Sequence, residues 1–191
     1  MPKSFFNSVR FANQLVMIIV ILEIVDSFTG FGLDRFGIRP WSIVGFIGVV
    51  FAPLLHYGWD HLFTNTIPLW VNTVILFSEK KFRPEWTFGV IWIASGLGTW
   101  IIGGFRSVDS IHLGASSVIF GLVCYLILMG IFLGRFLTIL VSFIVLFFFG
   151  GILTGVLPNP EMPQVSWEAH FSGALSGILA AIHNKFYKKP Q

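Results

Sequence analysis

Ser116 and His170 carry side chains suited to nucleophilic chemistry, and each lies near the start of an apolar run. The run that follows Ser116 continues to about Leu133. If it is a helix, its N-terminus offers unpaired backbone N–H groups and a partial positive charge. A serine at such a place has donors beside it that can stabilise an oxyanion, and histidine is the commonest general base. The pair is therefore a candidate for nucleophilic chemistry at a helix end.

Small residues near both positions allow a second interpretation. Two stripes with i, i+3, i+7 spacing are Gly114, Ser117 and Gly121, and then His170, Gly173 and Gly177. Residues at this spacing share one helix face, and small residues there are the usual contact between membrane helices. Taken alone, the first stripe is explained by packing. If the two stripes pack on each other, they also bring the Ser116 region close to His170.

The composition determines the class of protein that must position these residues. Of the 191 residues, 55% are hydrophobic and only 11% are charged, with a mean hydropathy of +0.82. Soluble domains have about 25% charged residues. The chain is therefore a polytopic membrane protein, too short to add a soluble domain, and we expect one domain over residues 1–191. The single cysteine, Cys124, excludes an intramolecular disulfide and a cysteine-based metal site, and no metal or cofactor is predicted.

The apolar runs predict six membrane-spanning helices. Their expected ranges are 11–26, 61–78, 86–103, 114–133, 136–156 and 167–183. The segment between the first two is long, and its apolar part, residues 43–55, contains Pro53 and is short for a span. We interpret that part as re-entrant or interfacial. The predicted fold class is therefore an all-α membrane protein, a six-helix bundle with a long outer connection between helices 1 and 2.

The basic residues predict the orientation of this bundle. Six crossings put both termini on one side, together with nine basic residues: Lys3, Arg10, Lys80, Lys81, Arg83, Arg135, Lys185, Lys188 and Lys189. Three basic residues lie on the other side: Arg35, Arg39 and Arg106. The positive-inside rule makes the side with nine cytoplasmic. Because the basic residues lie between apolar runs, they are topology signals and not a nucleic-acid surface.

This topology brings polar residues from three helices to one depth. The second, fourth and sixth helices all run from outside to inside, so His61, Ser116 and His170 approach the same outer leaflet. Asn65 lies one turn from His61 on the same face. Polar side chains inside a membrane are costly and usually face the bundle interior. A lone buried histidine is more often a satisfied polar residue than a base, but His170 faces a serine across a glycine interface. We expect His112 and His183 at the membrane interface.

These motifs together resemble those of the rhomboid family of intramembrane serine proteases. They read Gly114-Ala115-Ser116-Ser117, His170-x2-Gly173-x3-Gly177 and His56-x4-His61-x3-Asn65. Helix count and loop order agree as well, so the likeness covers nearly the whole chain. Ser117 stands where the family's serine motif has its second glycine. We assign Ser117 to packing between the fourth and sixth helices.

The resemblance implies a serine endopeptidase that cleaves transmembrane segments of other membrane proteins near the outer face of the lipid bilayer. Ser116 is then the nucleophile and His170 the general base, and the Ser116 N–H with His61 and Asn65 stabilises the oxyanion. Glu168 is about 200° round the helix from His170, so we expect a Ser–His dyad. The alternative is a non-catalytic rhomboid-like protein that binds or escorts membrane clients. The expected location is a prokaryotic cytoplasmic membrane with both termini cytoplasmic, and no oligomeric state is predicted.

Overall fold

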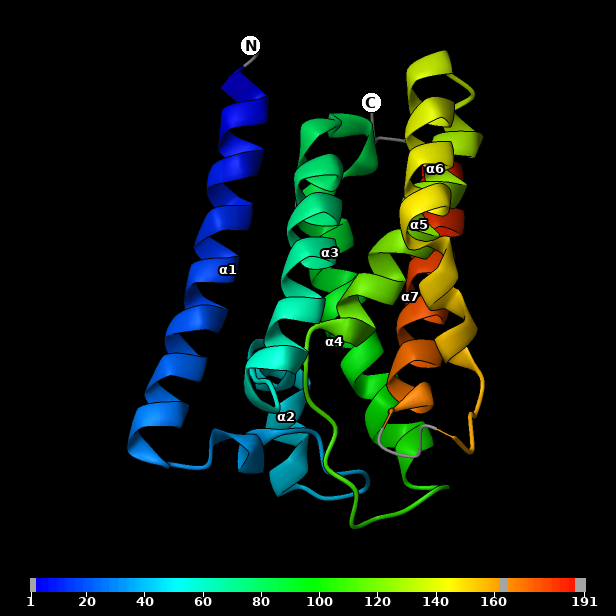
Figure 1. Cartoon of the computed structure of the whole chain (residues 1–191). Coiled ribbons are helices and arrows are strands. Elements are labelled where there is room, and N and C mark those ends of the chain that lie inside the picture. Colours follow the sequence, from blue (N-terminus) through cyan, green and yellow to red (C-terminus); the bar gives the residue numbers. More distant parts are fainter. Residues whose placement is uncertain (1–2, 162–164, 188–191) are drawn as a thin grey trace.

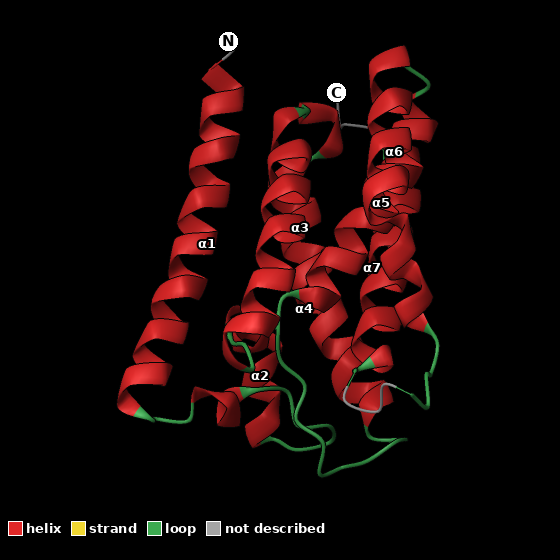
Figure 2. Cartoon of the chain, in the orientation of Figure 1, coloured by secondary structure: helices red, strands yellow, loops and turns green. Residues whose placement is uncertain are grey.

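The computed structural model, which describes residues 3–161 and 165–187, is a bundle of helices (Figures 1 and 2). Its six long helices are α1 (Lys3–Thr29), α3 (Gly58–Ser78), α4 (Pro84–Gly103), α5 (Ser116–Leu133), α6 (Phe136–Phe149) and α7 (Trp167–Phe186). No strand is present in the described part of the chain, which has only one isolated bridge between Ile38 and His112. The all-α fold class predicted from the sequence is confirmed.

Four of the predicted helix starts differ from the structure, and those of α3 and α4 lie three and two residues earlier than predicted. α1 begins at Lys3, so the short basic segment before residue 11 continues the helix. α5 begins at Ser116 instead of Gly114, because Gly114 adopts a φ of +105° that a helix does not allow. Ser116 is therefore the first residue of its helix, where the backbone N–H groups have no partner within the helix.

Four helical segments are long and apolar enough to cross a membrane. They are Phe5–Thr29, Lys80–Gly103, Ser116–Leu133 and Phe136–Val156, the last being α6 together with the 3₁₀ helix η5 (Gly150–Val156). α3 and α7 have 21 and 20 residues, which is enough for a span, but they are less apolar. These two helices carry His61, Asn65 and His170, and polar residues of this kind are what lowers their hydropathy. Length thus supports six spans, and hydropathy supports four.

The long connection after α1 folds as short helical pieces at one end of the bundle (Figure 1). The pieces are η1 (Leu33–Phe36), η2 (Val44–Ile47), α2 (Gly48–Phe51) and η3 (Ala52–Leu54). None is long enough to span, in agreement with the interpretation of residues 43–55 as re-entrant or interfacial. The Ile38–His112 bridge joins this connection to the segment that leads into α5.

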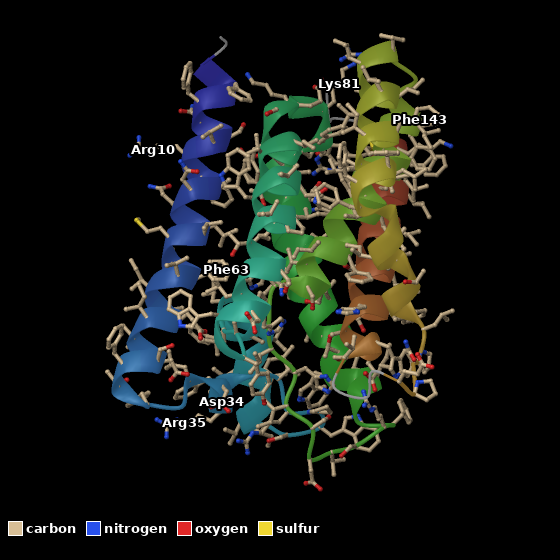
Figure 3. All side chains as sticks on the ribbon, in the orientation of Figure 1. Arg10, Asp34, Arg35, Phe63, Lys81 and Phe143 are labelled. Atoms are coloured by element: carbon tan, nitrogen blue, oxygen red, sulfur yellow. The ribbon has the colours of Figure 1, made fainter. Side chains whose placement is uncertain are left out.

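α1 begins and α7 ends at the same end of the bundle (Figure 1). Figure 3 shows Arg10 and Lys81 toward that end, and Asp34 and Arg35 at the opposite end. We call the first end the inner end and the second the outer end. The arrangement agrees with an even number of crossings, while Lys188 and Lys189, which contributed to the predicted orientation, lie outside the described residues.

α7 packs closely against both α4 and α5. A Cβ atom on Gly173 would fall on the carbonyl oxygen of Ser117, and one on Gly177 would fall on that of Gly121. The two backbones therefore touch directly, which small residues alone permit. On the α4 side, a Cβ on Gly98 would lie 2.8 Å from the Cβ of Ser172. These contacts hold α7 at a fixed height beside the helix that carries Ser116.

The inner end of the bundle contains a saturated polar cluster around Asn184. Its Nδ2 lies 2.6 Å from the Tyr125 hydroxyl, 3.2 Å from Thr87 Oγ1 and 3.3 Å from the Phe82 carbonyl oxygen. Its Oδ1 accepts a 3.0 Å bond from Arg83, whose guanidinium lies 3.6 Å from the centre of the Tyr187 ring. Since every polar atom of the Asn184 side chain has a partner, the cluster stabilises the bundle without costing unpaired groups.

Candidate active site

A cavity of about 850 Å³ lies among α3, α5, α7 and η5. Ser116, His170, His61 and Asn65 all line it, although they are up to 109 positions apart in the sequence. The structure thus brings together the four side chains that the sequence placed at one depth. The remaining lining is largely apolar, with Phe120 and Ile152 among its members.

The ring of His170 is held in one orientation by two contacts. Its Nδ1 lies 3.1 Å from the carbonyl oxygen of Gly155 in η5, and its plane stacks on the Phe120 ring with centres 4.0 Å apart. A carbonyl oxygen only accepts hydrogen bonds, so Nδ1 must carry the proton of the neutral ring. The lone pair of Nε2 is then available, which is the tautomer that a general base requires. A main-chain carbonyl here orients the histidine, as a carboxylate does in a triad.

Ser116 reaches the cavity from the first turn of α5, after a segment that the outer connection holds in place. The Gly114 N–H donates a 2.9 Å bond to the Ala52 carbonyl, and the Ala115 N–H lies 3.5 Å from Nε2 of His56. Within the described chain, the Ser116 hydroxyl and the His170 ring share no hydrogen bond. Bonds between nucleophile and base are often long without substrate and shorten in the reacting complex.

His61 and Asn65 present N–H donors to the same cavity. The Tyr57 N–H donates to Nδ1 of His61 at 3.2 Å, so the proton of the neutral His61 ring is on Nε2. The Asn65 amide nitrogen uses one hydrogen in a 2.8 Å bond to the His61 carbonyl oxygen, and its second hydrogen is available. The positions of the His61 ring proton and of the Asn65 amide hydrogens are assigned from their hydrogen-bond partners. Both groups can therefore donate to an oxyanion, as the sequence analysis expected.

The predicted packing stripe needs correction at Gly114. This residue lies before α5, and a Cβ on it would be 2.6 Å from Cε1 and 2.8 Å from Nε2 of His61. Gly114 therefore allows His61 to approach the serine segment, instead of packing on α7. Gly121, Gly173 and Gly177 do lie in the α5–α7 interface, since a Cβ on Gly121 would be 2.9 Å from the Gly173 carbonyl oxygen.

Ser117 belongs to two interfaces at once. Its backbone carbonyl faces Gly173 of α7, in agreement with the predicted packing. Its hydroxyl instead accepts a 3.3 Å bond from Ser95 of α4. Ser117 does not line the cavity. The two adjacent serines are thus separated by direction, with Ser116 toward the cavity and Ser117 toward α4.

The sequence did not predict the polar contacts beside the site that involve Glu168 and His112. Glu168 points away from His170 as expected, but it is fully buried and pairs with Arg106 at 3.4 Å. His112 was expected at the interface, but it is buried, with Nδ1 2.6 Å from Ser166 Oγ and Nε2 2.9 Å from Ser110 Oγ. Burial lowers the pKa of His112; Glu168 opposes the shift, and Arg106 adds to it. Ser166 directly precedes the predicted helix start at residue 167, where serine is a common N-cap, and this position is a signal that could have pointed to the cluster.

Comparisons with known proteins agree with this arrangement. A model of the rhomboid domain matches residues 42–184. An uncharacterized protein of Mycobacterium tuberculosis (strain H37Rv) is 42% identical over 169 residues, which cover 87% of this chain and 70% of that protein. An uncharacterized protein of Mycobacterium bovis has the same values, and one of Mycobacterium leprae is 38% identical over 167 residues, covering 86% of this chain and 66% of that protein.

Proposed function

The chain belongs to the rhomboid family, and from this premise we propose that it is an intramembrane serine endopeptidase. One observation carries the proposal: the cavity lined by Ser116, His170, His61 and Asn65, in which Nε2 of His170 is the unprotonated nitrogen. Family members generally cleave peptide bonds within membranes. The cavity contains each group that such a reaction needs.

The first half of the proposed reaction forms an acyl-enzyme. Oγ of Ser116 attacks the carbonyl carbon of the scissile peptide bond while its proton passes to Nε2 of His170. The negative charge that develops on the carbonyl oxygen is stabilised by the Ser116 N–H, by Nε2–H of His61 and by the second Nδ2–H of Asn65. The C–N bond then breaks, and the amine leaves with the proton from His170.

The second half hydrolyses the acyl-enzyme. Water attacks the carbonyl carbon of the ester and gives one proton to His170, and the negative charge on the carbonyl oxygen is stabilised by the same three donors. The Ser116–acyl bond breaks, and the serine recovers its proton from His170. Since Gly155 O holds Nδ1–H throughout, the carbonyl keeps the ring oriented as the imidazolium forms and disappears.

The proposed substrates are transmembrane segments of other proteins. The cavity lies toward the outer end of the bundle, so cleavage is expected near the outer end of a substrate helix, where unwinding exposes a peptide bond. The protein is an integral membrane protein, and we propose a bacterial cytoplasmic membrane with both termini cytoplasmic. We also propose that residues 1–191 form one domain, which the packing of α1 on α3 supports.

A fluorophosphonate probe tests this function directly. The purified protein in detergent should become labelled, and it should cleave a model transmembrane substrate in liposomes. Ser116→Ala should abolish both, and His170→Ala should lower both by at least about 10³-fold. Ser117→Ala is the matched control because it removes the adjacent hydroxyl, and it should label like wild type.

Two outcomes contradict the proposal. Labelling of Ser116→Ala but not Ser117→Ala would show that the nucleophile assignment is wrong by one residue. A folded wild-type protein that neither labels nor cleaves would favour the non-catalytic, client-binding alternative.

A further inference from the structure

An ion pair between the buried Glu168 and the partly exposed Arg106 joins the two segments that carry the proposed catalytic residues. Glu168 lies two residues before His170 in the first turn of α7, and its side chain has no exposed surface. Nη1 of Arg106 lies 3.4 Å from each carboxylate oxygen and 3.4 Å from the Val165 carbonyl. Arg106 comes from residues 104–115, the segment between α4 and α5 that ends at Ser116.

Hydrogen bonds extend this ion pair along the same segment. Oγ of Ser166 accepts a 3.3 Å bond from the Ala169 N–H and so caps α7, and it lies 3.4 Å from Oε2 of Glu168. The same oxygen lies 2.6 Å from Nδ1 of His112, four residues before Ser116. The first turn of α7 is thus fastened at two points to the segment that leads into the nucleophile.

The desolvation cost of burying the Glu168 carboxylate suggests that the ion pair has a role other than stabilising the fold. Taking a carboxylate out of water costs several kcal/mol, and its ion pair roughly compensates, so an apolar pair of similar volume would stabilise the fold as well. Hydrophobic contacts, however, leave a helix free to rotate slightly, whereas the charged bond fixes a direction. Glu168 and His170 are about 200° apart around α7, so fastening Glu168 on one side turns His170 toward the cavity.

We propose that Glu168 and Arg106 are positioning residues of the active site. Their ion pair sets the rotation of the first turn of α7 against residues 104–115, and thereby the distance between Nε2 of His170 and Oγ of Ser116. Neither residue lines the cavity, so neither touches the substrate. This inference rests on the proposed protease function and adds two residues to it that lie outside the dyad and the oxyanion donors.

The test removes the charge and keeps the shape. Glu168→Gln and Arg106→Gln should each lower kcat by about 10- to 100-fold, the loss expected for a misplacement of about 1 Å, with KM within twofold of wild type. Arg106→Lys, which keeps the charge, should recover most of the rate. The double variant should lose no more than either single one, because both break the same bond.

The matched control is Glu79→Gln, which breaks the 3.5 Å ion pair between Glu79 and Arg135 at the inner end. It should leave kcat and KM unchanged. All variants are assayed on a transmembrane substrate in liposomes, well below their thermal midpoints, and labelled with the fluorophosphonate probe. A purely structural role would lower the midpoint and leave the kcat of the folded fraction unchanged.

Failure of this inference differs from failure of the proposed function. If wild type labels and cleaves while Glu168→Gln keeps kcat within twofold, the ion pair has no positioning role. The same conclusion follows if the losses of the two single variants multiply in the double variant. If a folded wild type neither labels nor cleaves, the proposed function fails and this inference fails with it.

Discussion

The two ends of the α5–α7 pair treat their polar groups in opposite ways. At the inner end, each polar atom of the Asn184 side chain has a partner, and Tyr125 donates a further 2.6 Å bond to the Phe82 carbonyl. At the outer end, His170 uses one ring nitrogen, Asn65 uses one amide hydrogen, and Nδ1 of the buried His56 has no partner among the described residues. α5 and α7 thus run from a saturated cluster at the inner end to an outer region in which polar groups of α7, of α3 and of the segment before α3 keep hydrogen-bonding capacity.

The difference in hydrogen bonding suggests that the inner end contributes to stability and the outer end to the proposed chemistry. A satisfied hydrogen bond contributes about 1 kcal/mol, and leaving a buried group unpaired costs about 1–3 kcal/mol. Satisfied hydrogen bonds stabilise the inner end, whereas unpaired polar groups lower the stability of the outer end. Donors without partners are what the proposed reaction needs at its oxyanion, and the outer end keeps such donors on His61 and Asn65. Between the two ends, the contacts of Gly173 and Gly177 with α5 fix the position of α7 along α5.

The largest expected effect comes from separating the two helices. In Gly177→Leu the new side chain would begin at the Gly121 carbonyl oxygen, so α5 and α7 cannot keep their contact. We expect loss of the folded protein, measured as the absence of a monodisperse, thermally cooperative species in detergent. Gly89→Leu on α4 is the control, since a Cβ there meets nothing within 4 Å. A folded and active Gly177→Leu would contradict the direct backbone contact.

A change at the outer end should affect turnover alone. Asn65→Ala removes a proposed oxyanion donor and should lower kcat by about 10- to 10³-fold, with KM and thermal midpoint nearly unchanged. The control is Asn72→Ala, because Asn72 makes the same type of bond to the carbonyl four residues earlier but does not line the cavity. An effect of Asn65→Ala on KM alone would remove Asn65 from the oxyanion site.

A change at the inner end should affect stability alone. Asn184→Ala leaves the Arg83 and Tyr125 groups short of a partner and should lower the free energy of unfolding by about 1–3 kcal/mol. The kcat of the folded fraction should stay at the wild-type value, measured at a temperature where the variant is fully folded. If kcat falls while the protein stays folded, the two ends are coupled and the comparison does not hold.

The smallest effect is expected at Ser117, next to the proposed nucleophile. Ser117→Ala removes the 3.3 Å bond with Ser95 and should cost about 0.5–1.5 kcal/mol of stability. Ser117→Gly should behave in the same way, because the backbone carbonyl makes the contact with Gly173. Both should keep probe labelling and cleavage, with unfolding measured by denaturant titration. Loss of labelling in Ser117→Ala at wild-type stability would place this hydroxyl in the chemistry.

The sequence was sufficient for the features that have a regular period. Helix ranges followed from apolar runs, and the shared depth of His61, Ser116 and His170 followed from the alternation of crossings. The contact of Gly173 and Gly177 with α5 followed from their i, i+4 spacing. Each of these features depends on the helix period or on the order of the crossings, and both can be read from the sequence.

Features that depend on irregular backbone were not predictable in this way. The φ of +105° at Gly114 keeps this residue out of α5 and lets its backbone lie against His61. The carbonyl that orients His170 belongs to Gly155, in a 3₁₀ segment that the sequence analysis placed within a continuous helix. The Arg106–Glu168 pair joins residues 62 positions apart, one of them in a loop without a period.

The central place of α7 also bears on how the protein is made. α7 is the last helix that the structure describes, yet it packs against both α4 and α5 and supplies Asn184, Glu168 and His170. During synthesis, the helices before it enter the membrane with Tyr125 and Arg106 still lacking these partners. The bundle closes only when α7 packs, and α7 also carries the proposed base. In the proposed reaction, a chain without α7 has its nucleophile but no base, so a partly made molecule could not cleave its neighbours.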